Sequence, residues 1–307
     1  MKYKKALVTG SSGFIGSHIV DELKKNKIQV VLFDSVPSKY NLDNDKEIIG
    51  DLLNIDDIKR AAEGCDVIFH LAAQADIQLS SETPLETVKN NIIGTQNLLE
   101  VARTNQINRF IFASTIYVYS KLGSFYRVSK QACEKIIEEY QNQFNTNYTI
   151  LRYGSLYGPR ANKFNAINSF LIQALKNKKI IRKSNGEELR EYIHVMDAAK
   201  LSVKSLDSKY ENRYLIITGN QQIKVKNLLT MINEIFDSKI EVIYSNEEEL
   251  HHYQITPYNY RPQVAEKISQ NLYHDLGQGL VEQIYDLESE LNPSDKRQSI
   301  SLRKQKK

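Results

Sequence analysis

The chain of 307 residues is poor in the residue types that form disulfides, metal centres and membrane spans. It has no tryptophan and two cysteines, Cys65 and Cys133, which lack the spacing of metal ligands, so we expect buried free thiols and no metal site. Its longest apolar runs are far shorter than the roughly 20 residues of a transmembrane helix. The first strand pattern begins within a few residues of Met1 and leaves no room for a signal peptide, so we expect a cytoplasmic protein without membrane insertion.

A strongly basic surface is missing as well. The formal net charge is +4, but residues 295–307 hold six Lys or Arg against one Asp and carry +5, which leaves about −1 for the rest of the chain. Duplex binding requires a basic face, so we expect no nucleic-acid partner. The tail 291–307 is basic and poor in hydrophobic residues, a composition that predicts disorder.

The chain does contain a regular alternation of strand and helix patterns through residue 152. Such an alternation predicts a parallel sheet with helices on both faces. The alternation weakens after residue 155, where we expect a smaller lobe that folds back over the sheet edge. Strands are predicted near 4–9, 28–33, 66–71, 108–114, 147–152, 213–217 and 240–244, and residues 190–205 are predicted as a strand leading into a helix. Helices are predicted near 14–25, 55–63, 84–104, 126–144, 164–177, 224–236 and 278–290.

A glycine-rich turn joins the first predicted strand to the first predicted helix. Gly10, Gly13 and Gly16 would let the backbone and the helix N-terminus approach an anion closely. A tight turn without any ligand is the alternative interpretation. The second strand ends in Asp34, eighteen residues after Gly16, near the place where a carboxylate accepts hydrogen bonds from an adenosine ribose. The pair of features favours a dinucleotide.

Tyr126 and Lys130 lie four residues apart, on one face of a predicted helix. An adjacent ammonium and a hydroxyl in a partly desolvated cleft can lower the pKa of a tyrosine, so we expect this pair to act as an acid and base. A chance pair on an exposed helix face is the alternative. Thr115 ends the strand directly upstream, so its hydroxyl should emerge at the same carboxyl edge of the sheet, where ligands bind.

The glycine spacing and the Thr, Tyr and Lys set together resemble the extended short-chain dehydrogenase/reductases, the NAD-dependent nucleotide-sugar epimerase/dehydratase family with UDP-glucose 4-epimerase-like members. The resemblance covers roughly residues 4–290 and includes Leu-Ala-Ala-Gln at 71–74, Asn-Ile-Ile-Gly-Thr at 91–95 and segments 151–160 and 190–197. It implies a Rossmann-type doubly wound parallel sheet with a smaller α/β substrate-binding lobe. Residues 1–154 and about 191–218 would form the dinucleotide domain, and about 155–190 and 219–290 the substrate lobe. It also implies a homodimer.

The resemblance implies a role for each matching residue. Tyr126 would take the proton from a sugar hydroxyl, Lys130 would hold the nicotinamide ribose and lower the tyrosine pKa, and Thr115 would bind the reacting oxygen. Ser155, Arg190 and Arg261 would bind the substrate, the arginines through its diphosphate, although Arg261 lies in a more divergent stretch and could instead be a surface residue. NAD would be bound by Gly10, Ser12, Gly13, Phe14, Ile15, Gly16, Asp34, Asp51, Leu52, Leu71, Ala72, Ala73, Gln74, Asn91, Lys130 and Tyr153.

The chain also departs from the family pattern. The dehydratases carry Asp and Glu where this chain has Ile116 and Tyr117, so elimination is not expected. Ser155 replaces an Asn common in 4-epimerases. Only eleven residues separate Thr115 from Tyr126, and this short connection predicts an open sugar pocket with loose discrimination between ring substituents.

The sequence leaves three functions open. An NAD-dependent epimerase acting at C4 of a UDP-sugar through a transient 4-keto sugar is favoured. A reductase of a nucleotide-linked keto sugar using NAD(P)H and a dinucleotide-sensing module are the alternatives, and the complete Thr115, Tyr126 and Lys130 set argues against the sensor. Asp34 favours NAD because a carboxylate repels a 2′-phosphate, whereas Lys39 leaves NADP open.

Overall fold

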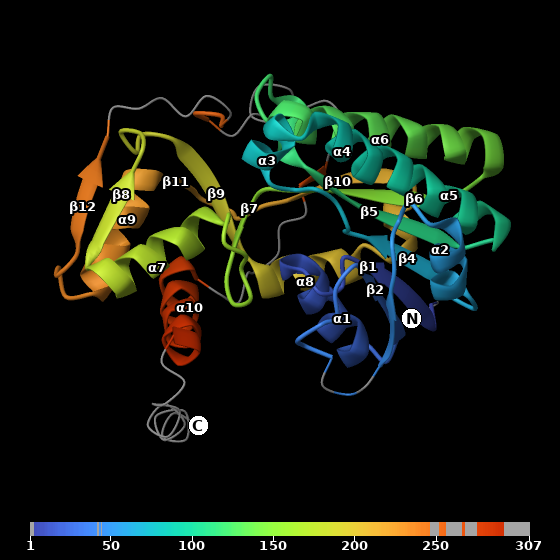
Figure 1. The fold of residues 1–307 in the computed structure, drawn as a ribbon, viewed down its shortest axis with the longest axis horizontal. Coiled ribbons are helices and arrows are strands. Elements are labelled where there is room, and N and C mark those ends of the chain that lie inside the picture. Colours follow the sequence, from blue (N-terminus) through green and yellow to red (C-terminus); the bar gives the residue numbers. More distant parts are fainter. Residues whose placement is uncertain are drawn as a thin grey trace.

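The computed structural model describes residues 3–41, 43, 45–245, 252–255, 266–267 and 275–291. Within these residues eight strands form one parallel sheet in the order β13-β10-β6-β5-β4-β1-β2-β3. Figure 1 shows this sheet with helices on both of its faces, and a smaller lobe beside it. The predicted doubly wound α/β fold is confirmed. The strands of the large sheet are β1 (Lys5–Thr9), β2 (Gln29–Asp34), β3 (Lys46–Ile49), β4 (Val67–His70), β5 (Arg109–Thr115), β6 (Tyr148–Tyr153), β10 (Arg213–Ile217) and β13 (Glu266–Lys267).

The two faces of the sheet are covered by different helices, each of which buries an apolar stripe. One face packs against α1 and α8 through residues such as Leu23 and Leu201. The other packs against α2, α5 and α6 through residues such as Ile58, Leu99 and Ile137. Cys65 and Cys133 are buried and free, as expected. The covering helices are α1 (Phe14–Lys25), α2 (Ile55–Ala62), α5 (Gly94–Thr104), α6 (Ser124–Phe144) and α8 (Val195–Lys204).

The smaller lobe has its own hydrophobic cluster, which includes Leu171, Ile180, Leu228 and Leu280. Among the described residues, a three-stranded sheet with the order β11-β9-β7 and a two-stranded sheet of β12 and β8 belong to this half of the chain. The lobe's elements are β7 (Ser155–Tyr157), α7 (Ala166–Asn177), β8 (Lys179–Arg182), β9 (Leu189–His194), β11 (Gln222–Lys224), α9 (Val225–Ile235), β12 (Glu241–Tyr244) and α10 (Leu276–Leu291).

Several local predictions were wrong. The expected single helix at 84–104 consists of α4 (Pro84–Val88), a π-helical turn (Lys89–Ile93) and α5. The short elements β3 and α3 (Ile77–Glu82) were not predicted, because four to six residues carry too little periodicity to be recognised. Two short 3₁₀ turns complete the described elements, Ile116–Tyr119 after β5 and Ser208–Tyr210 before β10.

Candidate active site

The glycine turn between β1 and α1 has the close packing that only glycine permits. Gly10 has a φ of +71°, and a Cβ there would meet the Ala72 nitrogen at 2.7 Å. A Cβ on Gly16 would lie 2.0 Å from the Gly10 carbonyl oxygen. No side chain caps α1, whose N-cap residue is Gly13, so the positive end of the helix is open to an anion.

Asp34, at the end of β2, is fixed beside this turn. Its carboxylate accepts hydrogen bonds from the Ser12 amide at 2.9 Å and the Ser35 amide at 2.8 Å. The Ser12 hydroxyl in turn donates to the Val36 carbonyl at 2.8 Å. Ser12 therefore holds Asp34 and the glycine turn together.

A cavity of about 930 Å³ lies at the carboxyl ends of the parallel strands. This is the volume class of small-molecule and cofactor sites. Of the residues predicted from the sequence, those on its wall are Gly10, Gly13, Phe14, Ile15, Gly16, Asp34, Asp51, Leu52, Leu71, Ala72, Ala73, Gln74, Thr115, Tyr126, Lys130 and Tyr153. Ser12, Asn91, Ser155 and Arg190 do not line it.

Sequence reasoning missed other parts of the wall. Ile49 comes from the unpredicted strand β3, and Asp57 accepts a hydrogen bond from the Asp51 amide at 3.1 Å. Asn162 and Phe164 reach the cavity from the loop that follows β7. A local sequence pattern carries no signal for such loop residues, because tertiary packing brings them to the cavity.

Thr115 and Tyr126 meet at the wall of this cavity. Thr115 is the last residue of β5 and pairs in register with Tyr153 on β6. Its side chain lies near enough to Tyr126 to act on the pKa of that phenol. Lys130, one turn further along α6, donates from Nζ to the Ala113 carbonyl at 2.7 Å. The Lys130 Nζ lies 6.0 Å from the centre of the Tyr126 ring.

The electrostatics of this corner differ from the expectation. Burial raises the pKa of Tyr126 to about 12, and the nearby Thr115 side chain opposes that rise only in part. Burial lowers the pKa of Lys130 to about 8. The prediction that Lys130 lowers the tyrosine pKa is therefore wrong for the protein alone. The ammonium is directed at a backbone carbonyl, and both groups lose hydration.

Asn91, predicted to bind cofactor, lies behind the cavity wall in the π-helical turn. Its Oδ1 accepts from the Gln74 amide at 2.7 Å, and its Nδ2 donates to the Gln74 carbonyl at 3.1 Å and to the Ser129 hydroxyl at 2.9 Å. Ser129 donates to the Tyr126 carbonyl at 2.8 Å. Asn91 thus connects the segment that lines the cavity at Gln74 to the helix that carries Tyr126.

Two of the three residues predicted to bind substrate, Ser155 and Arg190, lie near Tyr253. The Arg190 guanidinium lies 4.2 Å from the centre of the Tyr253 ring. Burial raises the pKa of Tyr253, and the nearby Arg190 and Ser155 side chains oppose that rise. Arg261 lies outside the described residues. Tyr253 is the member of this group that sequence reasoning missed, since nothing in its local pattern distinguishes it from the chain's other tyrosines.

A sequence profile of the "NAD dependent epimerase/dehydratase family" matches residues 6–216. The matched region contains the glycine turn, Asp34 and the Thr115, Tyr126 and Lys130 corner. The chain belongs to this family. NAD is the cofactor that the family's description names.

Family relatives of this chain differ in the reaction that their names give. A Methanocaldococcus jannaschii protein named "Putative UDP-glucose 4-epimerase" is 31% identical over 81% of this chain and 88% of its own length. A Bacillus cytotoxicus protein named UDP-N-acetyl-alpha-D-glucosaminuronate decarboxylase is 27% identical over 78% of this chain and 83% of its own. The family alone therefore leaves the reaction open.

Solved structures of the family share this fold over nearly the whole chain. The UDP-glucose 4-epimerase of Thermotoga maritima, solved with UDP-glucose, superposes with a TM-score of 0.80 at 25% identity and covers 94% of this chain and 99% of its own. In the stretches that the structure describes, no helix has both the length and the apolar character needed to cross a membrane.

Proposed function

We propose that the protein is an NAD-dependent epimerase of nucleotide-linked sugars, acting most simply at C4 of a UDP-sugar through a transient 4-keto sugar. The convergence of Thr115, Tyr126 and Lys130 on one wall of the cavity carries this proposal. It places two hydroxyl groups where one can bind a sugar oxygen and the other can exchange its proton, with Lys130 one helical turn away.

The cavity fits NAD. The turn at Gly10, Gly13 and Gly16 leaves room for a pyrophosphate where any Cβ would meet backbone, and Asp34 is held at the end of β2 to accept hydrogen bonds from a ribose diol. The same carboxylate would repel a 2′-phosphate, which favours NAD over NADP. When bound, NAD supplies a hydride acceptor and, in its oxidised form, a positive ring charge that favours the Tyr126 phenolate.

The chain's own residues divide the proton chemistry. With its pKa raised to about 12, Tyr126 keeps its proton at neutral pH in the protein alone and becomes a base only when positive charge enters the cavity. Thr115 orients the phenol and the sugar hydroxyl. Lys130 supplies a positive charge, and the pKa of its ammonium group, which burial lowers to about 8, lies close to neutral pH. The phenol then returns the proton to the keto oxygen when the sugar is reduced on its other face.

The substrate side is proposed from Arg190 and Ser155. A guanidinium can form two parallel hydrogen bonds to a diphosphate. Arg190 stacks on the Tyr253 ring and donates from Nη1 to the Leu189 carbonyl at 2.9 Å. UDP is the nucleotide of the Thermotoga structure. Elimination chemistry is not proposed, because Ile116 and Tyr117 stand where the dehydratases have carboxylates and the Tyr117 hydroxyl is hydrogen-bonded to His252 at 2.6 Å.

The test is to incubate the purified protein with UDP-, GDP-, CDP- and dTDP-sugars without added cofactor and to identify products by NMR. We expect interconversion of a UDP-hexose and its C4 epimer by protein that already carries NAD. The lack of tryptophan makes bound NADH easy to follow by fluorescence. Turnover that requires stoichiometric external NADPH would assign the protein as a reductase instead.

A further inference from the structure

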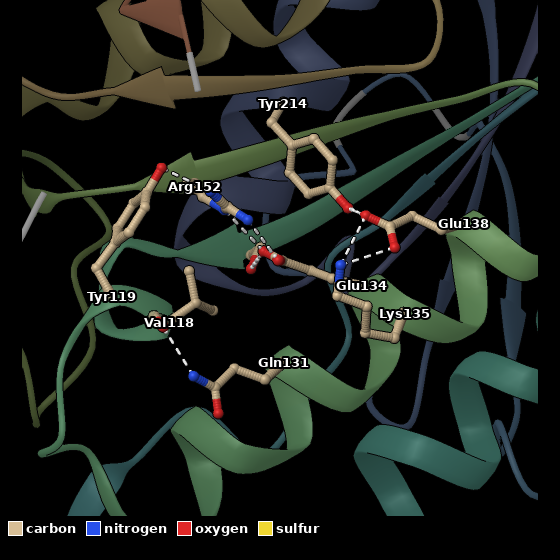
Figure 2. Close-up of polar contacts among 9 residues, drawn as sticks. Val118, Tyr119, Gln131, Glu134, Lys135, Glu138, Arg152 and Tyr214 are labelled. Carbon is tan, nitrogen blue, oxygen red and sulfur yellow. Dashed lines mark hydrogen bonds and ion pairs between the residues drawn. The ribbon is translucent and has the colours of Figure 1, made fainter. Parts of the chain in front are cut away.

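A buried ion pair lies next to the candidate active site. Arg152 on β6 and Glu134 on α6 are joined by two hydrogen bonds, Nη2 to Oε2 at 2.7 Å and Nε to Oε1 at 3.0 Å (Figure 2). Their side chains are only 7% and 4% exposed. Removing two charges from water costs several kcal/mol per ion, so such a pair needs a further explanation beyond stability.

The ion pair lies close to both Thr115 and Lys130. The Ser114 hydroxyl donates to Glu134 Oε1 at 2.5 Å, and Ser114 directly precedes Thr115. Glu134 is one turn beyond Lys130 on α6. The ion pair therefore links the end of β5, which carries Thr115, to helix α6, which carries Lys130.

The same pair fixes the short connection between Thr115 and Tyr126. Arg152 Nη1 donates to the Tyr119 hydroxyl at 2.6 Å, and the guanidinium lies 4.7 Å from the centre of the Tyr119 ring. From α6, Gln131 donates to the Val118 carbonyl at 2.7 Å, as Figure 2 shows. The connection is thus held at Val118 and Tyr119 by side chains from both α6 and β6.

We propose that Glu134 and Arg152 are positioning residues, which keep Thr115 at the end of β5 in register with Tyr126 and Lys130 on α6. This inference rests on the proposed function for its kinetic consequences. The geometry is independent of that function, because the contacts join three elements of the fold whatever reaction takes place in the cavity.

Glu134 also acts on the charge of Lys130. Burial lowers the pKa of Lys130, and negative charge on Cys133 or Glu134 opposes this. Burial raises the pKa of the Cys133 thiol, so at neutral pH only the Glu134 carboxylate supplies such a charge. The other groups that face the ammonium carry no opposing charge at neutral pH. Tyr126 keeps its proton, and His70 on β4 is neutral because burial lowers its pKa to about 3. Removing the Glu134 carboxylate should therefore lower the pKa of Lys130 further.

The test compares Glu134→Gln with Lys135→Gln in the full chain. Lys135 belongs to an exposed ion pair with Glu138 on the same helix and serves as the matched control. We expect Glu134→Gln to lower kcat roughly tenfold to hundredfold, the cost of a displacement of about 1 Å, while KM and NAD affinity stay within about twofold. The alkaline limb of the pH profile should move to lower pH. Lys135→Gln should match the wild type.

A second readout does not need turnover. The titration of Lys130, followed by NMR of 13Cε-labelled lysine and assigned with Lys130→Met, should have a lower midpoint in Glu134→Gln. A folded Glu134→Gln protein with wild-type kcat and an unchanged Lys130 midpoint would overturn the inference. If the wild type turns over no nucleotide sugar, the proposed function fails, and the lysine titration alone then tests the inference about Glu134 and Arg152.

A variant that does not fold would be replaced by Tyr119→Phe. That change removes the hydroxyl that accepts from Arg152 and leaves the ion pair intact. We expect a several-fold lower kcat with an unchanged Lys130 midpoint, because only the connection loosens. Wild-type kcat in Tyr119→Phe would contradict the part of the inference that concerns the connection.

Discussion

The cofactor side and the proposed substrate side of the molecule are held in place in different ways. On the cofactor side the pairing of adjacent strands places Thr9 beside His70 and Thr115 beside Tyr153 at one edge of the sheet. On the substrate side Ser155 and Arg190 lie on the neighbouring strands β7 and β9 of the three-stranded sheet, and Tyr253, from a distant part of the sequence, lies near both. The eight-stranded sheet alone forms the first side, whereas the second combines a short sheet with a contact from a distant segment. The cofactor side should therefore tolerate change less.

The largest effect is expected from Tyr126→Phe. The variant loses the group that exchanges a proton with the sugar, and general acid–base catalysis contributes roughly 10²- to 10⁴-fold, so kcat should fall by that factor. NAD affinity should stay the same, because no phosphate contact is removed. Steady-state kinetics and cofactor titration measure the two quantities. More than a few per cent of wild-type activity would show that the assigned mechanism is wrong.

The next effect is a loss of NAD affinity in Gly16→Ala. The added Cβ would lie 2.0 Å from the Gly10 carbonyl oxygen, so the turn must shift. Overpacking costs about 1–3 kcal/mol, which corresponds to a loss of roughly tenfold to hundredfold in affinity. Calorimetric titration of stripped protein with NAD measures it. Gly277→Ala, at the start of α10, is the control and should bind NAD as the wild type does.

Lys130→Met should stabilise the protein at pH 7. Folding lowers the pKa of Lys130 from 10.5 to about 8, so the buried charge destabilises the fold fully below pH 8. Removing this charge should raise the free energy of unfolding by about 3 kcal/mol, and the loss of the hydrogen bond to the Ala113 carbonyl should lower that gain by about 1 kcal/mol. Because wild-type Lys130 loses its charge, the gain should shrink as pH rises from 8 to 10.5. Denaturant unfolding at pH 7 and pH 10 tests this, and equal gains at both would contradict it.

The smallest effect is expected on the substrate side. Arg190→Ala should raise KM for the nucleotide sugar roughly tenfold, the value of one charge-assisted hydrogen bond, and leave NAD affinity unchanged. Arg190→Lys should restore little, since it keeps the charge but lacks the planar fork. Initial-rate kinetics with both variants decide this. An equal loss of NAD affinity would mean that Arg190 belongs to the cofactor side.

The difference between the two sides also explains what could be predicted from the sequence. The strands and the wall residues that follow them were predicted, because apolar runs mark buried parallel strands and ligands bind at their carboxyl ends. The contacts of Asn91 with Gln74 and Ser129 were not, since they join residues 17 and 38 positions apart. Tertiary packing also determined the pKa of Tyr126, which depends on burial. The open sugar pocket inferred from the short connection stays a prediction.

The central claim is that one hydride leaves a sugar carbon and returns to it within the same active site. The direct test uses UDP-glucose deuterated at C4, incubated with the purified protein in ordinary water without added cofactor. We expect UDP-galactose that keeps the deuterium at C4, together with a transient NADH signal that is absent in Tyr126→Phe. Product that has lost the label, or product that forms only when NADPH is supplied, would contradict it.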